Sequence, residues 1–208
     1  MLEIEYKGAN SVIITGKDAS LWIDPLSNPA SHKPGKSTIV YLGTEQRFMP
    51  AVSDDALHLE GPGEYETGPF WIHGVAAQRH IDTLEQGKAV TIYRVDVGEF
   101  RVGILGNIDP NLSEDQLEAI GTVDFLVIPV GGGGYTLDAT TAAKIVRQVE
   151  PNVVVPVHYA DQGVSYEVPQ DSLETFIHEL GAPVETLPKV KMKNTSSIPQ
   201  TLTVYRIG

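Results

Sequence analysis

The stretch that decides the fold runs from residue 123 to residue 159 and reads VDFLVIPVGGGGYTLDATTAAKIVRQVEPNVVVPVHY. It opens with an apolar run, passes through four glycines, and ends in a second run of branched apolar residues that stops at His158. Between the two runs, apolar residues recur at near-helical spacing: Ala142, Ala143, Ile145, Val146 and Val149. A strand, a helix and a second strand are therefore predicted here.

Upstream of this unit, the chain is rich in short β-type segments. They read LEIEY, SVIIT, SLWID, STIVYL, PFWIHGV, AVTIYRVDV and FRVGIL, at residues 2–6, 11–15, 20–24, 37–42, 69–75, 89–97 and 100–105. Turn signals such as GKDAS, GPGEYETG and VGEF separate them, which is typical of hairpins and a meander. The first half is therefore predicted to be mostly sheet.

Two further helices and a closing strand are predicted around the unit. Residues 113–121 begin with Ser113 as a helix N-cap and end at Gly121, and a second helix within residues 169–182 is stopped by Gly181. The segment TLTVYRI at residues 201–207 reads as the last strand. The expected architecture is α/β (α+β), a sandwich of two mixed β-sheets with helices outside.

Composition narrows the class of protein. With 208 residues and 41% hydrophobic content, we expect one domain over residues 1–208. A net charge of −12 disfavours nucleic acid and anionic membranes as partners, and the absence of cysteine excludes thiolate ligands and nucleophiles. The N-terminus does not read as a signal peptide, and no window has the length of apolar residues that a membrane span needs, so a soluble, cytoplasmic protein is expected. Residues 27–37 read as a proline-rich surface loop.

Two histidines are candidates for a site. His158 follows a buried strand, where ligands of α/β proteins are often bound, although a lone histidine is more often structural. His80 also follows a strand and is near Asp82, so a metal or general-base role is open. The glycine run Gly131–Gly134 lacks the lysine of a phosphate-binding loop and is predicted to be a tight turn, with Thr136 capping the helix after it.

Taken in order, six segments resemble the metallo-β-lactamase superfamily, and within it the small branch similar to ascorbate-6-phosphate lactonase. They lie within residues 1–160: YKGANSVIITGKDASLWIDPL, STIVYLGTEQRF, GPGEYETGPFWIHGV, TIYRVDVGEFRVGILGNID, VDFLVIPVGGGGYTLDATTAAKIV and VVVPVHY. The resemblance implies an αβ/βα four-layer sandwich with a metal site at the edge where loops of the two sheets meet.

The resemblance also implies that most metal ligands are missing. The family motif His-x-His-x-Asp-His corresponds to Thr44, Gln46, Phe48 and Met49, and its bridging aspartate corresponds to Asn107. The histidine that the family often has near its start is replaced by Ala9. His158 matches the last histidine of the family and His80 the middle one, so these two are the remaining metal candidates. Phe48 and Met49 are expected to fill the pocket in place of the metal ligands.

Three interpretations remain open. The leading one is a catalytically inactive hydrolase homologue without a metal, whose pocket or surface binds a small molecule or a protein. The alternative is a hydrolase of phosphoesters, lactones or similar substrates. It would hold zinc or manganese in an atypical mononuclear site built from His80, His158 and Asn107, with an acid such as Glu45, Asp109 or Glu64. The third is a structural subunit that pairs with an active paralogue, or a homo-oligomer.

Overall fold

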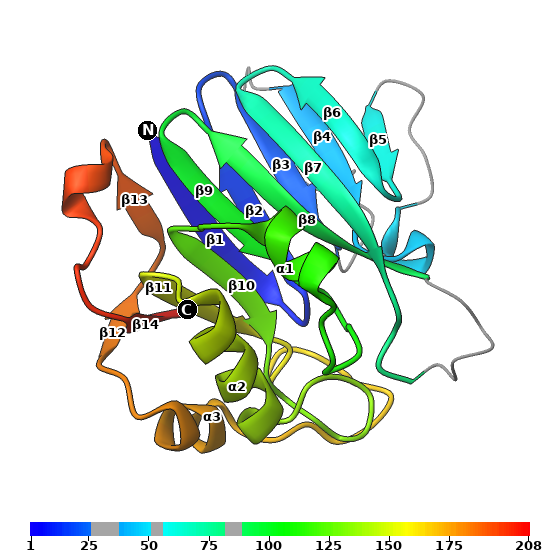
Figure 1. Cartoon of the computed structure of the whole chain (residues 1–208), viewed down its shortest axis with the longest axis vertical. Coiled ribbons are helices and arrows are strands. Elements are labelled where there is room, and N and C mark those ends of the chain that lie inside the picture. Colours follow the sequence, from blue (N-terminus) through cyan, green and yellow to red (C-terminus); the bar gives the residue numbers. More distant parts are fainter. Residues whose placement is uncertain (26–37, 51–55, 82–88) are drawn as a thin grey trace.

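The computed structural model describes residues 1–25, 38–50, 56–81 and 89–208, which form two β-sheets and three α-helices (Figure 1). The predicted proline-rich loop at 27–37 and Asp82 lie outside the described residues. Both sheets are mixed, as expected from the sequence. Among the described residues, no helix is long and apolar enough to cross a membrane.

The smaller sheet has six strands. Their order across the sheet is β13 (Val190–Met192), β1 (Leu2–Gly8), β2 (Ser11–Thr15), β3 (Ala19–Ile23), β4 (Thr38–Gly43) and β5 (Leu57–Glu60). The pairs β13–β1, β1–β2 and β2–β3 are antiparallel, whereas β3–β4 and β4–β5 are parallel. Alternate residues of β1 and β3 are buried, which is the period of a strand with one face on the core.

The larger sheet has eight strands. Their order is β12 (Val184–Leu187), β14 (Thr203–Ile207), β11 (Val153–Val157), β10 (Phe125–Pro129), β9 (Phe100–Ile104), β8 (Val90–Val97), β7 (Phe70–Ala77) and β6 (Gly63–Thr67). Strands β6 to β9 pair antiparallel, as the predicted meander requires, and β9, β10, β11, β14 and β12 pair parallel. Every residue of β10 and β11 is buried, because both faces of these strands are covered.

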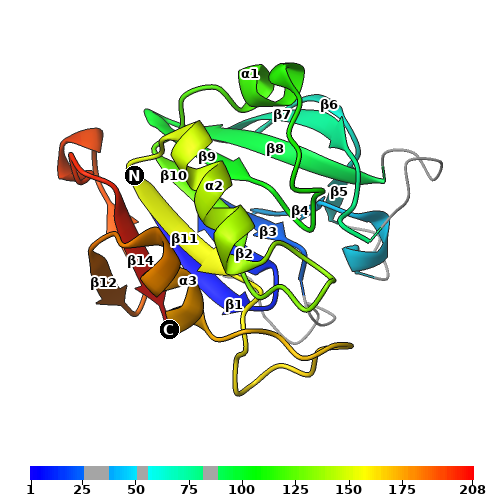
Figure 2. The same cartoon turned by 60° about the horizontal axis from the view of Figure 1, so that its bottom comes forward.

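Two apolar clusters hold these layers together. The first lies between the sheets and joins residues such as Leu21 and Leu42 of the six-stranded sheet to Tyr93 and Phe125 of the eight-stranded sheet. The second packs the helices α1 (Glu114–Ile120), α2 (Ala139–Val149) and α3 (Leu173–Leu180) against the other face of the eight-stranded sheet. Figure 2 shows α2 lying along β10 and β11 on that face.

The helix boundaries follow their caps. Ser113 and Gln116 form a capping box at the start of α1, and Gly181 ends α3 in a left-handed conformation, both as predicted. The predicted cap of α2 was wrong by two residues. Asp138, not Thr136, accepts a hydrogen bond from the Thr141 amide (2.8 Å), and Thr136 is buried with its hydroxyl unpaired among the described residues.

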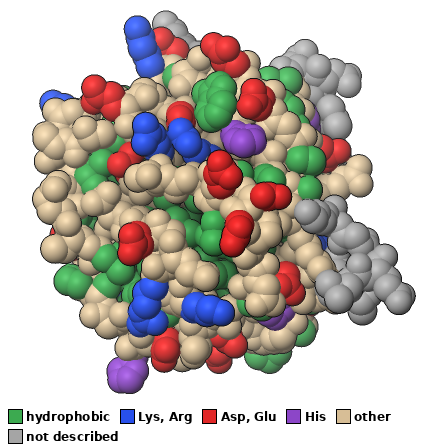
Figure 3. Space-filling model, viewed as in Figure 1, with side chains coloured by type: hydrophobic (Ala, Val, Ile, Leu, Met, Phe, Trp, Pro, Cys, Tyr) green, Lys and Arg blue, Asp and Glu red, His purple; other side chains and the backbone are tan. Residues whose placement is uncertain are grey.

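Charge is distributed over the surface. Figure 3 shows acidic side chains spread across one face and interspersed with Lys and Arg. Lys189 precedes the edge strand β13 and Lys191 lies within it, and both pair with Glu3 of β1, at 2.5 and 3.7 Å. These two lysines therefore place charge at the sheet edge, which discourages pairing with another strand.

Candidate functional site

Chain segments that follow strands of both sheets meet at one edge of the molecule. Ala9 and Asn10 form the turn between β1 and β2, Asp24 follows β3, and Thr44 and Glu45 follow β4. Asn107 comes soon after β9 and His158 directly after β11. Ala9, Asp24 and His158 all have left-handed backbones (φ 46, 43 and 52°), a conformation that L-residues seldom adopt and that gathers at functional sites.

Asn107 lies at the centre of a buried polar cluster. Its Oδ1 accepts a hydrogen bond from Asn10 Nδ2 (3.1 Å), and its Nδ2 donates to Glu45 Oε1 (3.2 Å). Glu45 is 3% exposed and forms ion pairs with two guanidinium groups, Arg47 Nε at 2.9 Å and Arg79 Nη1 at 3.5 Å. Both ends of the Asn107 amide are therefore engaged, and the charge beside it is balanced by arginine.

Asp24 forms a second buried polar pair at the same edge. Its two carboxyl oxygens accept from the Thr44 backbone amide (2.7 Å) and the Thr44 hydroxyl (2.5 Å). Burial raises the pKa of Asp24 to about 7, and the hydrogen bonds from Thr44 oppose that rise. The carboxyl is therefore partly protonated near neutral pH.

His158 is fixed by its neighbours on both sides. Its backbone amide donates to the Ala9 carbonyl (2.7 Å), and its Nδ1 lies 3.1 Å from Gln170 Oε1. Gln170 Nε2 donates to the Val168 carbonyl (2.9 Å), which directs its Oε1 at the imidazole. Burial lowers the pKa of His158. The ring is therefore neutral near pH 7, with Nδ1 as the donor and Nε2 as an acceptor.

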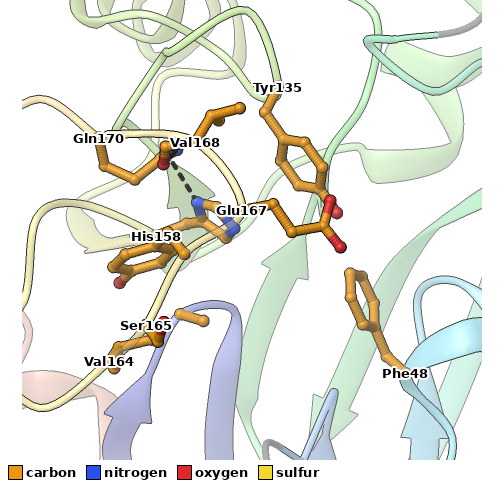
Figure 4. A pocket seen from close by; sticks show the side chains of 10 residues that line it. Phe48, Tyr135, His158, Val164, Ser165, Glu167, Val168 and Gln170 are labelled. Carbon is orange, nitrogen blue, oxygen red and sulfur yellow. Dashed lines mark hydrogen bonds between the residues drawn. The ribbon is translucent and has the colours of Figure 1, made fainter.

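A cavity of about 150 Å³ opens beside His158. Figure 4 shows how its side chains lie, and the wall residues are Ala9, Phe48, Tyr135, His158, Val164, Ser165, Tyr166, Glu167, Val168 and Gln170. The His158 ring stacks on Tyr135 (centroids 5.6 Å apart, 14° between planes) and contacts Tyr166 at 5.0 Å. Four of the ten wall residues therefore carry aromatic rings, and two of these rings contact the imidazole.

The glycine run holds the loop that makes this cavity. A Cβ on Gly131 would lie 2.1 Å from the His158 carbonyl oxygen, and one on Gly133 would lie 2.6 Å from the Pro169 carbonyl oxygen. The Asp171 amide donates to the Gly131 carbonyl (2.7 Å). The run permits close backbone contact with residues 158–171, which agrees with the prediction of a tight turn.

The structure brings only some of the expected site positions together. Phe48 and His158 line one cavity, whereas Thr44 is bonded to Asp24. Gln46 is exposed in the 3-10 helix Gln46–Phe48, with its amide 3.5 Å from Glu60. Met49, expected to fill the pocket with Phe48, does not line this cavity: its Sδ packs on Gly43, where the missing side chain leaves room for it.

The other candidates do not line the cavity beside His158. His80 donates its backbone amide to the Asn107 carbonyl (2.9 Å). Asp109 accepts from the Asn111 amide (2.9 Å), Glu64 is exposed on β6, and neither acid lines the cavity. Of the three suggested acids, Asp109 and Glu64 are thus outside the cavity wall, and Glu45 is held by arginines.

These side chains do not fit the metal centre that the resemblance implies. In the described part of the chain, no three His, Asp or Glu side chains gather so that they could hold a metal ion. At the aspartate position, the side-chain carbonyl oxygen of Asn107 already accepts from Asn10, and Arg47 and Arg79 place positive charge next to it. A divalent cation there would meet two guanidinium groups, which already neutralise the Glu45 carboxylate next to Asn107.

Comparisons with known proteins agree with the fold. Residues 3–158 match the family described as the beta-lactamase superfamily domain. The chain is 29% identical over 121 residues to UPF0173 protein PF0020 of Pyrococcus furiosus, a match that covers 57% of this chain and 53% of that protein. The chain therefore matches about half the length of this curated relative.

Two solved structures have a similar fold. One, from Thermotoga maritima, is assigned to the Zn-dependent hydrolases of the metallo-beta-lactamase superfamily (TM-score 0.74, 18% identity, 100% of both chains). The other is Igni18, a metallo hydrolase from Ignicoccus hospitalis (TM-score 0.63, 15% identity, 100% of this chain and 96% of that chain). At these identities the likeness concerns the fold alone.

Proposed function

This chain belongs to the beta-lactamase superfamily, and from that membership we propose that it is a member without metal-dependent hydrolysis, which binds a small molecule in the cavity beside His158. The proposal concerns the edge where the family resemblance places its reaction. There, the fold is kept and the donor atoms that the reaction needs are replaced.

The observation that carries the proposal is the arginine-paired Glu45 beside Asn107. A metal-bound hydroxide requires a cation held by several anionic or imidazole ligands. At this position Glu45 is already neutralised by Arg47 and Arg79, and the Asn107 amide is bonded at both ends. A metal would have to displace the arginines from the buried Glu45 carboxylate, or break the Asn107 hydrogen bonds, before it could bind.

One observation favours the alternative, a metal-dependent hydrolase. The Nδ1 atom of His80 is buried and has no hydrogen-bond partner among the described residues. His80 Nδ1 and His158 Nε2 are two imidazole nitrogens that could bind a zinc or manganese ion. Two imidazoles give fewer protein ligands than a catalytic zinc normally has, so we place this function second.

Metal content is the test. The protein is purified without chelator, incubated with zinc or manganese, freed of unbound ion and analysed for metal. Two variants accompany it: His158→Ala, and His178→Ala on the exposed face of α3 as the matched control. We expect all three proteins to hold far less than one metal per chain, and no hydrolysis of lactone, phosphoester or thioester substrates above the buffer rate.

A metal that depends on His158 would contradict the proposal. If wild type and His178→Ala bind about one metal per chain and His158→Ala loses it, a His158-dependent metal site exists and the proposal is wrong. Turnover of any of the three substrate classes that disappears in His158→Ala would overturn it in the same way.

A further inference from the structure

The cavity beside His158 presents hydrogen-bond acceptors and π faces, and two of its donors are already used. Gln170 donates to the Val168 carbonyl, and the Tyr166 hydroxyl donates to the Tyr159 carbonyl at 2.7 Å. No lysine or arginine belongs to the wall within the described residues. The hydroxyls of Tyr135 and Ser165 can donate or accept, so a ligand that brings donors of its own finds acceptors here and no charged donor in the wall.

Two acceptors face that ligand. Nδ1 of His158 is bonded to Gln170, so the lone pair of Nε2 is left for the cavity, and the ring carries no charge that would repel a cation. Glu167 is exposed at the rim, and its carboxylate forms no hydrogen bond or ion pair within the described residues. Figure 4 shows that carboxylate directed toward Tyr135. Burial raises the pKa of Tyr135, Arg47 opposes that rise, and Glu45 and Glu167 add to it.

The aromatic rings of this site already hold one cation on the outside of the cavity. The Arg47 guanidinium lies 4.7 Å from the centroid of Phe48 and 5.1 Å from that of Tyr135. Its charge is matched by Glu45, at 2.9 and 3.1 Å, and Arg47 is not part of the cavity wall. The rings are thus placed for cation–π contact, and the wall keeps an unmatched carboxylate.

We propose that this cavity binds a small organic cation: a protonated amine on a flat apolar body of about the size of benzene. The ammonium group pairs with Glu167 and donates to Nε2 of His158, while Phe48, Tyr135 and Tyr166 surround the apolar body. A cavity of 150 Å³ accommodates a molecule of that size. The net charge of −12 favours the approach of a cation. The inference rests on the proposed function, because a metal at His158 would take the same Nε2 lone pair.

Calorimetric titration with three probes of one shape tests the inference. Benzylamine is the cation, benzyl alcohol the neutral isostere and benzoate the anion. Wild type is expected to bind benzylamine at least about tenfold more tightly than benzyl alcohol, since a charge-assisted hydrogen bond and a cation–π contact are both lost with the charge. Benzoate is expected not to bind.

Variants assign the selectivity to Glu167. Glu167→Gln is expected to weaken benzylamine binding about tenfold and to leave benzyl alcohol unchanged, whereas Glu185→Gln on the exposed strand β12 changes neither. Equal binding of amine and alcohol, or tighter binding of benzoate, overturns the cation inference but leaves a binding cavity in place. Absence of binding by all three probes also overturns it. The proposed function fails separately, through metal content or turnover.

Discussion

At the scale of single residues, Asp24 is the buried carboxyl with the clearest consequence for stability. It is 3% exposed, and its hydrogen-bond donors are both from Thr44. Its pKa is raised from 3.8 to about 7 by burial. Between these two values the folded protein binds more protons than the unfolded chain, so the stabilising contribution present at low pH is lost as pH rises through about 7.

The substitution Asp24→Asn removes this titration. An asparagine side chain keeps an acceptor for the Thr44 amide and tolerates the left-handed backbone at this position (φ 43°). The unfolding free energy of the variant, measured relative to that of wild type, should increase by about 3 kcal/mol from about pH 5 to about pH 8, because only the wild-type side chain becomes charged. Urea unfolding followed by circular dichroism at several pH values measures it.

Asp18→Asn is the matched control for this experiment. Asp18 also has a left-handed backbone (φ 62°) but is exposed. The unfolding free energy of Asp18→Asn, measured relative to that of wild type, should not show the increase between about pH 5 and about pH 8 expected for Asp24→Asn. If the Asp24→Asn difference is equally flat, the carboxyl of Asp24 does not change its protonation over this range and the argument from burial is wrong.

The sequence predicted where His158 lies but not what surrounds it. A histidine directly after an apolar run is placed at a strand end by the local pattern alone. The partners of Glu45 are different, because Asn107 lies 62 positions away along the chain and Arg79 lies 34 away. Such pairings depend on how two sheets meet, and no periodicity within one segment carries that information.

At the scale of elements, helix ends were predicted better than short strands. Ser113 and Gly181 are local signals, since capping involves residues within one turn. At α2 two candidates, Thr136 and Asp138, lie close together, and the helix starts after the second. The sequence predicts a turn where the structure has the strand β6, because GEYET at residues 63–67 lies next to glycines and contains no aliphatic residue. In the structure, its residues alternate between half-buried and exposed positions.

The glycine run gives a prediction for the loop between β10 and α2. A Cβ at Gly131 would lie 2.1 Å from the His158 carbonyl oxygen and 2.5 Å from Gln170 Oε1. Gly131→Ala should therefore force the segment 158–171 away and destabilise the protein by about 2 kcal/mol, as overpacking does. The same shift should weaken benzylamine binding in the cavity. Thermal unfolding and calorimetry measure the two effects.

Gly163→Ala provides the comparison, within the segment 158–171 that Gly131 contacts. A Cβ at Gly163 meets nothing within 4 Å, and its backbone is not left-handed. This variant should keep both the stability and the binding of wild type. Equal behaviour of the two alanine variants would mean that the contact between the glycine run and residues 158–171 does not fix the cavity.

At the scale of the whole molecule, two sheets must be held in register at the edge that carries the site. The sequence order of strand-rich half, then strand–helix–strand unit, predicted the two mixed sheets. It could not predict how the two sheets are connected, which is through the crossover from β5 to β6 at residues 61 and 62 and the contacts beside it. There, the Tyr93 hydroxyl of β8 donates to the Gly43 carbonyl of β4 (2.9 Å), with the Gly61 carbonyl 3.3 Å away.

Tyr93→Phe tests this connection. Tyr93 is fully buried between the sheets, so loss of its hydroxyl removes an inter-sheet hydrogen bond without changing the ring. The expected loss of stability is about 1–2 kcal/mol by urea unfolding. Tyr205→Phe is the control, because Tyr205 is buried at 4% exposure and forms no side-chain hydrogen bond within the described chain. Since Gly43 immediately precedes Thr44 and Glu45, Tyr93→Phe should also increase hydrogen exchange at these two amides. Equal effects of both phenylalanine variants would mean that the Tyr93 hydrogen bond does not hold the two sheets together here.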